Sequence, residues 1–213
     1  MKLYCTPPSP NSRKVLAVIR HLALDVEIEP VDLTQGEQMT PAYLAINPNH
    51  LTPALVDGDF KLWESNAIIQ YLASLGPENS LWPLAPETRA DISRWQCWLL
   101  AHLGPALDVF AFERLVKPLF GIGEPDETAV ERISDTFHRF ATILDTHLAE
   151  RDWLVGDRLT LADFSLGAPF ALKEIARIPV DDYAAINRWY ARIEALDAWQ
   201  QTHVAPPPRT QAA

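Results

Sequence analysis

The sequence predicts a two-domain protein in which a small α/β domain is followed by an all-α domain. Three observations predict this division. Short β-like segments alternate with helical ones over residues 1–78. A stretch rich in proline and polar residues follows at 79–88, as is typical of a linker. From 89 to 213, apolar residues recur at three- and four-residue steps, the period of helices packed into one domain.

The first domain is expected to run in the order β-α-β-α-β-β-α. Val26, Ile28 and Val31 alternate with acidic residues, which indicates a half-buried strand. Asp57-Gly58-Asp59 is typical of a hairpin turn. The expected elements are a strand at 2–6, a helix beginning near residue 11, strands at 26–31, 54–56 and 60–63, a short helical segment at 43–46, and a helix at 64–75.

The second domain is predicted to be helical throughout. Its helical faces are formed by Ile92, Trp95, Leu99, His102, Leu103, Ala106 and Phe110, by Val130, Ile133, Phe137, Phe140, Leu144 and Leu148, and by Ile186, Trp189, Ile193 and Leu196. The segment 121–125, with two glycines and a proline, ends the first of these helical stretches.

Composition narrows the classes of partner and compartment. The chain has 48% apolar and 22% charged residues and a formal charge of −10, without a basic stripe, which argues against nucleic acid and anionic membranes as partners. No apolar run approaches the length of a membrane-spanning helix. The two cysteines, Cys5 and Cys97, lie far apart and fit a reducing compartment, so we expect a cytosolic protein without a metal site.

Ser9-Pro10-Asn11-Ser12 stands where the first strand gives way to the first helix. A helix N-terminus has unpaired N–H groups and a partial positive charge, so it favours a nearby anion. Ser9 or Ser12 could be an ordinary cap. We assign the cap to Ser12, which leaves the Ser9 hydroxyl free to donate to a thiolate and favour its ionised form.

Two further motifs follow. Thr52-Pro53 opens a strand, and a cis bond there would turn the Thr52 backbone outward to pair with an extended peptide. Without a cis bond it is a plain turn. Glu64-Ser65-Asn66 opens a helix, where Ser65 can cap, the N–H groups can hold a carboxylate and Glu64 can hold an ammonium. Both charges together suit an α-amino acid head group, although an ordinary capped helix has the same residues.

The order of these motifs resembles that in the cytosolic glutathione transferases, and in particular their serine-type classes (theta, delta and related bacterial forms). The resemblance rests on Ser9-Pro10-Asn11-Ser12-Arg13, on residues 47–53 (NPNHLTP) and on residues 63–68 (WESNAI). In the helical half, residues 156–164 (GDRLTLADF) resemble the family's N-capping box and hydrophobic staple. The resemblance implies an N-terminal thioredoxin-like domain with a mixed four-stranded sheet, followed by a helical bundle.

The resemblance also implies a glutathione site and the role of each residue in it. Ser9 hydrogen-bonds the sulfur, with Asn11 as a second donor; Thr52 and Pro53 meet the cysteinyl part; Glu64 and Ser65 hold the γ-glutamyl head, beside Asn66, which replaces an arginine; and Gln38 and His50 meet the glycine end. Glutathione would be a co-substrate attacking a small hydrophobic electrophile, and the protein would be a cytosolic homodimer.

Two alternative functions stay open at this point. One is glutathione-dependent disulfide or peroxide reduction, which would need two glutathione molecules because no cysteine stands at the first helix. The other is a non-catalytic interaction module. The remaining residues are assigned structural roles: Cys5 to the core, Cys97 to the core or an interface, and Asp163 to folding. Trp95 and His102 are assigned to the core, with the lining of a second substrate pocket between the domains as the alternative.

Overall fold

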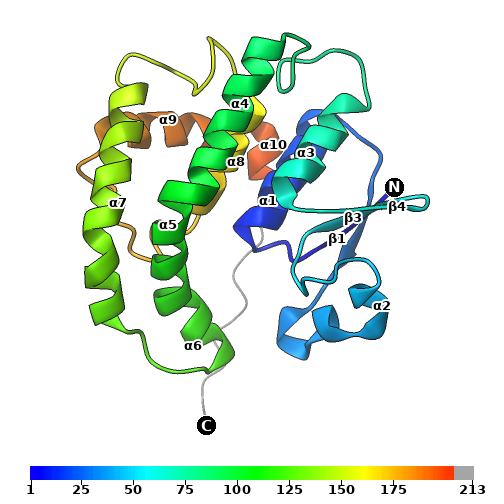
Figure 1. Cartoon of the computed structure of the whole chain (residues 1–213), viewed down its shortest axis with the longest axis horizontal. Helices are drawn as coiled ribbons and strands as arrows, with labels where there is room; N and C mark the ends of the chain where they lie inside the picture. The colour runs from blue at the N-terminus through cyan, green and yellow to red at the C-terminus, as the bar shows by residue number, and fades with distance from the viewer. Residues whose placement is uncertain (204–213) are drawn as a thin grey trace.

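The computed structural model describes residues 1–203 and shows an α/β unit lying beside a helical domain (Figure 1). The last ten residues of the predicted second domain, 204–213, lie outside the described part. The strands are β1 (Lys2–Cys5), β2 (Glu27–Pro30), β3 (Ala54–Asp57) and β4 (Phe60–Trp63). The helices are α1 (Pro10–His21), α2 (Pro41–Leu44), α3 (Ser65–Ser74), α4 (Pro86–Trp98), α5 (Gly104–Ala111), α6 (Lys117–Phe120), α7 (Glu127–Leu148), α8 (Leu161–Phe170), α9 (Ala184–Glu194) and α10 (Asp197–Gln200).

The four strands form one mixed sheet in the order β2-β1-β3-β4. β1 and β2 are parallel and are joined through α1, whereas β3 runs antiparallel to both β1 and β4. Leu3 of β1 pairs with Leu55 of β3, and both side chains are buried. The element order and the mixed sheet confirm the predicted thioredoxin-like unit.

Helix α1 lies between the sheet and the helical domain (Figure 1). It begins at Pro10, because proline is favoured in the first turn, where its missing N–H costs nothing. Its residues from Ser12 to Ile19 are buried except Arg13, since the helix packs on α3 and also on α8 and α10 of the helical domain. The position of Ser9, immediately before this helix, is therefore fixed by contacts from both domains.

Helices α4, α5 and α6 follow one another through two π-helical turns, Leu99–Leu103 and Phe112–Val116. Gly104 follows the first turn, and a Cβ there would lie 2.6 Å from the Leu99 carbonyl oxygen, which explains why glycine is needed. Asp126 caps α7 by accepting from the N–H groups of Thr128 and Ala129. The sequence analysis predicted these helices but not the π-helical turns.

One large hydrophobic core runs through both domains, and a smaller cluster of Val31, Tyr43 and Ala54 lies in the first domain. The large core contains Leu3 and Val15 from the first domain, together with Leu103 and Phe164 from the second. Helix α3 ends at Ser74 and α4 begins at Pro86, so the start of α4 overlaps the segment 79–88 predicted as a linker. A continuous core holds the two domains in a fixed relation, as a site between them requires.

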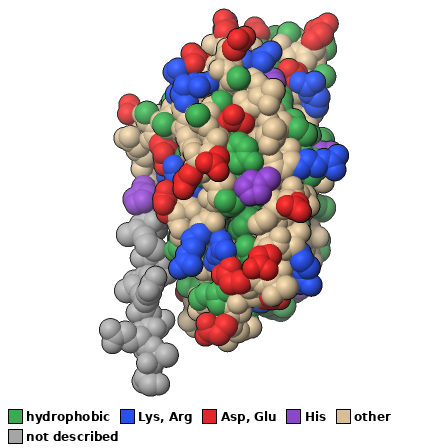
Figure 2. Space-filling model, turned by 90° about the vertical axis from the view of Figure 1, so that its left-hand side faces the viewer, with side chains coloured by type: hydrophobic (Ala, Val, Ile, Leu, Met, Phe, Trp, Pro, Cys, Tyr) green, Lys and Arg blue, Asp and Glu red, His purple; other side chains and the backbone are tan. Residues whose placement is uncertain are grey.

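The surface carries charges of both signs. Figure 2 shows acidic and basic side chains interspersed over one face of the molecule, without a single-sign patch there. Within residues 1–203, no helix is both long enough and apolar enough to cross a membrane.

Candidate functional site

Ser9 occupies the N-cap position of α1, with φ −67° and ψ 132°, and its side chain makes no capping hydrogen bond. Its backbone N–H donates to the Thr6 carbonyl oxygen at 2.9 Å. Among the residues that the structure describes, the half-buried hydroxyl has no hydrogen-bond partner, so it is available at the positive end of the helix, as the expected thiolate contact requires.

The assignment of the cap to Ser12 was wrong. Ser12 lies inside the first turn and is fully buried, and its Oγ accepts from the Thr6 N–H at 3.1 Å. The physical reason is that Pro10 sets the start of the helix one residue after Ser9, which turns Ser12 back toward the end of β1. Ser12 thus stabilises the junction between β1 and α1 through this hydrogen bond.

Thr52 and Pro53 lie next to this junction. The Thr52–Pro53 peptide bond is cis, and Pro53 is buried immediately before β3. The Thr52 hydroxyl donates to Thr6 Oγ1 at 3.1 Å, and the Thr6 hydroxyl donates to the Val31 carbonyl oxygen at 2.9 Å. These bonds hold the segment before β3 against the segment before α1.

The N-terminus of α3 meets that of α1. Ser65 Oγ donates to Asn11 Oδ1 at 3.3 Å. Ser65 is the first residue of α3 and Glu64 stands at the N-cap position, so the prediction that Ser65 caps the helix was wrong. Glu64 has a φ of +70°, and such a conformation costs about 1–3 kcal/mol for a residue with a side chain. Strain of this kind concentrates where ligands bind, because the backbone must present particular groups.

Gln38 and His50 lie in the segments between β2 and β3. Gln38 sits in a short 3₁₀ turn, Glu37–Met39, and His50 has a φ of +59°. Gln38 Oε1 and His50 Nδ1 are both buried without a hydrogen-bond partner among the described residues. Buried polar atoms nearly always have a partner, and Gln38 Oε1 and His50 Nδ1 are free to hydrogen-bond a polar ligand.

Asn47 is a residue of this region whose role the sequence analysis missed. It is buried, and its Nδ2 donates to the Leu51 carbonyl oxygen at 2.7 Å, which also accepts from Tyr43 Oη at 2.6 Å. Its Oδ1 accepts from the Asn49 N–H at 3.0 Å. Asn47 therefore fixes the turn that carries His50. The Asn47-Pro48-Asn49 run was a signal for such a turn, because asparagine side chains bond to nearby backbone groups.

Asn66 is directed toward the interior. Its Oδ1 accepts from Lys14 Nζ at 2.8 Å and from Ser165 Oγ at 3.0 Å. Lys14 is only 1% exposed, and burial lowers its pKa to about 7, although nearby Glu64 acts in the opposite direction. The sequence analysis missed Lys14. The available signal was its place on α1 four residues before Val18, on the apolar face.

Buried Lys14 gives the protein a defined dependence of stability on pH. Its ordinary pKa is 10.5 and its folded-state pKa is about 7, so between these values the unfolded chain holds the extra proton. The free energy of unfolding should therefore rise with pH in this window, by at most about 1.4 kcal/mol per pH unit. Urea unfolding of the unaltered protein and Lys14→Met from about pH 7 to about pH 10 measures this as the difference between their slopes.

Arg20→Met is the matched control, since Arg20 is an exposed cation on the same helix. Its stability should follow that of the unaltered protein at each pH. Parallel slopes for the unaltered protein and Lys14→Met would contradict the prediction.

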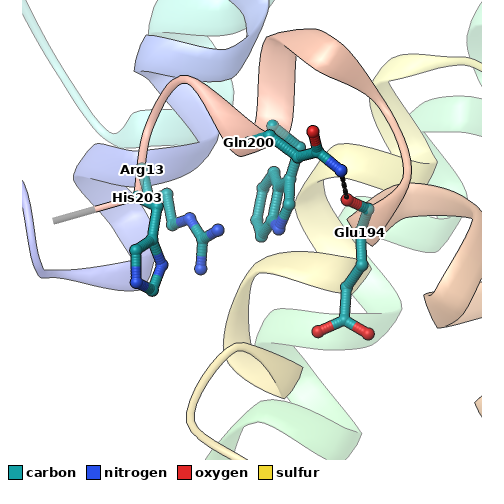
Figure 3. A pocket seen from close by; sticks show the side chains of 5 residues that line it. Arg13, Glu194, Gln200 and His203 are labelled. Atoms are coloured by element: carbon teal, nitrogen blue, oxygen red, sulfur yellow. Dashed lines mark hydrogen bonds between the residues drawn. The ribbon is translucent and has the colours of Figure 1, made fainter. Parts of the chain in front are cut away.

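Ser9 is not among the residues that line two cavities of the structure. A cavity of about 320 Å³ is lined by Arg13, Glu194, Trp199, Gln200 and His203 (Figure 3). The guanidinium of Arg13 lies 4.3 Å from the Trp199 ring centroid, and its Nε donates to Thr202 Oγ1 at 2.9 Å. These contacts attach α10 to the first turn of α1, the helix whose N-cap residue is Ser9.

Four of the structural assignments can now be compared with the fold. Cys5 and Trp95 are buried as predicted, and burial raises the pKa of the Cys5 thiol to about 11. The core assignment of His102 was wrong, and a core position for Cys97 is excluded as well, because both side chains are exposed. For His102 the reason is the π-helical turn Leu99–Leu103, which changes the face of the helix on which this residue lies. Among residues 1–203, no group of His, Cys, Asp and Glu side chains could hold a metal ion.

Asp163 has the structural position that was expected. The Asp163 carboxylate reaches back to the Thr160 N–H at 2.8 Å, which is one half of the predicted capping box at the start of α8. Its other oxygen accepts from the Leu154 N–H and from Trp189 Nε1, both at 2.9 Å. Asp163 is fully buried, and its role is structural, unlike the role expected of Ser9.

Comparison with known proteins identifies the family. Residues 1–74 match the glutathione S-transferase N-terminal domain and residues 104–197 match the glutathione S-transferase C-terminal domain. The chain is 38% identical to glutathione S-transferase 3 of Zea mays, over all of this chain and 99% of that protein.

Solved structures agree with this assignment. Glutathione transferase F7 from Populus trichocarpa superposes with a TM-score of 0.86 at 28% identity, covering 94% of this chain and 96% of that one. Glutathione S-transferase III in its apo form superposes with a TM-score of 0.83 at 35% identity, covering 97% and 99%. The expected theta- or delta-like bacterial type is corrected by these plant relatives. The motifs at Ser9, Thr52 and Glu64 did not separate the serine-type classes from one another. The chain belongs to the glutathione S-transferase family.

Proposed function

We propose that this protein transfers glutathione to an electrophilic carbon of a small hydrophobic molecule, with Ser9 hydrogen-bonded to the glutathione sulfur. The observation that carries the proposal is the uncommitted Ser9 hydroxyl at the start of α1, beside the Asn11–Ser65 hydrogen bond that joins the two helix N-termini. A thiolate there would face a hydroxyl donor and the positive end of a helix. Both favour the ionised sulfur over the thiol.

The remaining site residues take places along the tripeptide in this proposal. Glu64 pairs with the γ-glutamyl ammonium and the first N–H groups of α3, with Ser65, receive its carboxylate. The Thr52 backbone, held by the cis peptide before Pro53, pairs with the cysteinyl part. Gln38 and His50 contact the glycine end, and Asn11 is a second donor to the sulfur. Asn66 lies behind Glu64 and Ser65.

The site needs to lower the pKa of the glutathione thiol by only a modest amount. A free thiol of this type has a pKa of about 8.5, and lowering it by about two units requires roughly 2.7 kcal/mol of preferential stabilisation of the thiolate. A hydrogen bond to a charged group contributes about 1.5–3 kcal/mol. The Ser9 hydroxyl and the helix together can therefore make the thiolate the main form near neutral pH, and holding the electrophile beside it supplies further acceleration.

Glutathione binding itself is tested at Glu64. Replacing Glu64 with Gln keeps the size of the side chain and removes the charge that pairs with the ammonium. We expect the KM for glutathione to rise about 10- to 100-fold, because a charge-assisted contact of about 1.5–3 kcal/mol is lost. Steady-state kinetics with a chloronitrobenzene substrate measures this, and retention on immobilised glutathione gives a second readout.

Exposed Asp59→Asn is the charge-matched control, because it removes an equal charge in the β3–β4 turn. An unchanged KM in Glu64→Gln would contradict the assignment of the head group. No binding of glutathione by the unaltered protein would leave the interaction module as the function. Turnover of a mixed disulfide, but not of the chloronitrobenzene, would favour the reductase.

The relatives support a finer classification, which we also propose. We infer that the chain groups with the phi class of plant enzymes. We infer a homodimer, with the faces around 65–72 and 90–103 as contacts. We retain the division at 79–88 as the domain boundary, and a cytosolic location, which the free thiols of Cys5 and Cys97 fit.

A further inference from the structure

A buried cation lies directly behind the N-terminus of α3. Lys14 is on α1, which packs on α3 and α8, and its side chain is 1% exposed. Within residues 1–203, its Nζ has one hydrogen-bond partner, Asn66 Oδ1 at 2.8 Å. A lysine is almost never fully buried unless it is paired, so this contact calls for a functional explanation.

Asn66 is itself held from the helical domain. Ser165 Oγ of α8 lies 3.0 Å from Asn66 Oδ1 and 2.8 Å from the Leu161 carbonyl oxygen, so these two acceptors share its one hydroxyl proton. Ser165 Oγ itself accepts from Gln96 Nε2 of α4 at 2.9 Å. Gln96 Oε1 in turn accepts from Gln70 Nε2 of α3 at 2.6 Å. Lys14 therefore stands at one end of a mostly buried polar network that joins four helices from both domains. A buried network of this kind restrains the arrangement of its members, and the Lys14 ammonium enters it through one bond, to Asn66.

The network ends at the proposed glutathione site. Asn66 follows Glu64 and Ser65 in the chain, and Glu64 holds a positive φ that persists only where surrounding contacts determine it. The Glu64 carboxylate also acts on Lys14 by charge. Lys14 thus contacts the residue that follows Glu64 and Ser65, the two residues proposed to hold the γ-glutamyl head. It is buried and does not lie at the surface where that head would bind.

We propose that Lys14 is a positioning residue of the glutathione site: its ammonium holds Asn66, and so keeps the first turn of α3 in the arrangement that presents Glu64 and Ser65 to the ligand. The proposal rests on the function proposed above. Lys14 acts through Asn66 and does not touch the tripeptide.

This arrangement depends on the charge of Lys14. Burial lowers its pKa to about 7. Of the charged groups on the elements packed against α1, α3 carries Glu64 at its start, α8 carries Asp163 and α10 carries Asp197. Asp163 is engaged by Leu154, Thr160 and Trp189, and Glu64 is the group whose charge acts on Lys14. Above neutral pH the ammonium loses its proton, the bond to Asn66 loses its charge assistance, and the affinity for glutathione should fall.

The experiment measures kcat and KM for glutathione from about pH 6 to about pH 9, a range that brackets the Lys14 transition, in the unaltered protein, Lys14→Met, Asn66→Asp and the exposed-cation control Arg20→Met. In the unaltered protein, KM should rise about tenfold across the range, as expected for the loss of charge assistance. Lys14→Met should have the high KM at every pH, with kcat changed less than about threefold, because uniform binding rather than chemistry is affected. Arg20→Met should match the unaltered protein.

Asn66→Asp supplies the readout that a merely structural role would not move. A carboxylate beside Lys14 should hold its proton to higher pH and shift the rise in KM upward by about one pH unit. Equal KM profiles for the unaltered protein and Lys14→Met would overturn the proposal. An unshifted KM profile in Asn66→Asp would also overturn it, and this variant provides the test if Lys14→Met does not fold. A failure of the unaltered protein to use glutathione overturns the proposed function instead, and this proposal with it.

Discussion

Replacing Ser9 with Ala should lower the turnover number about 100- to 1,000-fold, because removing one preorganised donor to a reacting anion has an effect of that size. The same change should raise the pKa of the bound glutathione thiol toward its value in free solution, since the hydroxyl no longer favours the thiolate. The ultraviolet absorbance of the thiolate, titrated in the binary complex, measures that pKa directly. Steady-state turnover of a chloronitrobenzene gives the rate.

Two variants act as controls for this result. Ser9→Thr keeps a hydroxyl and should retain much of the turnover. Ser12→Ala removes the acceptor of the Thr6 N–H, so it should lower the free energy of unfolding by about 1–3 kcal/mol and leave the thiol pKa in place. Because Ser9 makes no capping bond, Ser9→Ala should change stability by less than about 0.5 kcal/mol. Undiminished turnover with an unchanged thiol pKa in Ser9→Ala would exclude the proposed role.

The arrangement of strands and helices was predictable because its signals are local. The alternation around Ile28, the hairpin turn at Gly58 and the apolar stripe of α7 each depend on residues close together in the chain. The two π-helical turns were not predictable in this way. They insert a residue into an otherwise regular helical run, and the resulting outward turn of His102 depends on how the run packs on α7.

Candidate site residues could be named from the sequence, and their local geometry could be predicted only in part. Ser9, Thr52 and Glu64 were proposed because each stands at the start of a helix or strand, where backbone groups are free. The exchange of roles between Ser9 and Ser12 was missed, since either serine could cap and only the fold brings the Thr6 N–H to Ser12. Lys14 was missed for the opposite reason: its meaning depends on Asn66 and Ser165, which are distant in sequence and meet only at the domain interface.

A second network in the helical domain, around Asp163, should dominate the stability of the protein. The carboxylate accepts from the Leu154 N–H, the Thr160 N–H and hydroxyl, and Trp189 Nε1. It thereby joins the loop before α8, the start of α8 and the middle of α9. Asp163 is fully buried, and burial raises the pKa of its carboxyl even though each of these donors lowers it.

Replacing Asp163 with Ala should lower the free energy of unfolding by about 3–9 kcal/mol, because three buried N–H donors each lose a partner worth about 1–3 kcal/mol. That is a large part of the 5–15 kcal/mol typical of a folded protein, so much of the variant should be unfolded at physiological temperature. Urea unfolding followed by tryptophan fluorescence measures the loss.

Graded variants separate the role of the network from simple loss of volume. Asp163→Asn keeps one acceptor oxygen, so it should fall between the unaltered protein and Asp163→Ala. Thr160→Ala removes the smallest contact, the hydroxyl bond, and should cost about 1 kcal/mol. If Asp163→Asn and Asp163→Ala were equally stable, the hydrogen bonds to Leu154 and Trp189 would make no net contribution to the free energy of unfolding. Because α8 also supplies Ser165 to the Asn66 contact, partial loss of this network should weaken glutathione binding before it unfolds the chain.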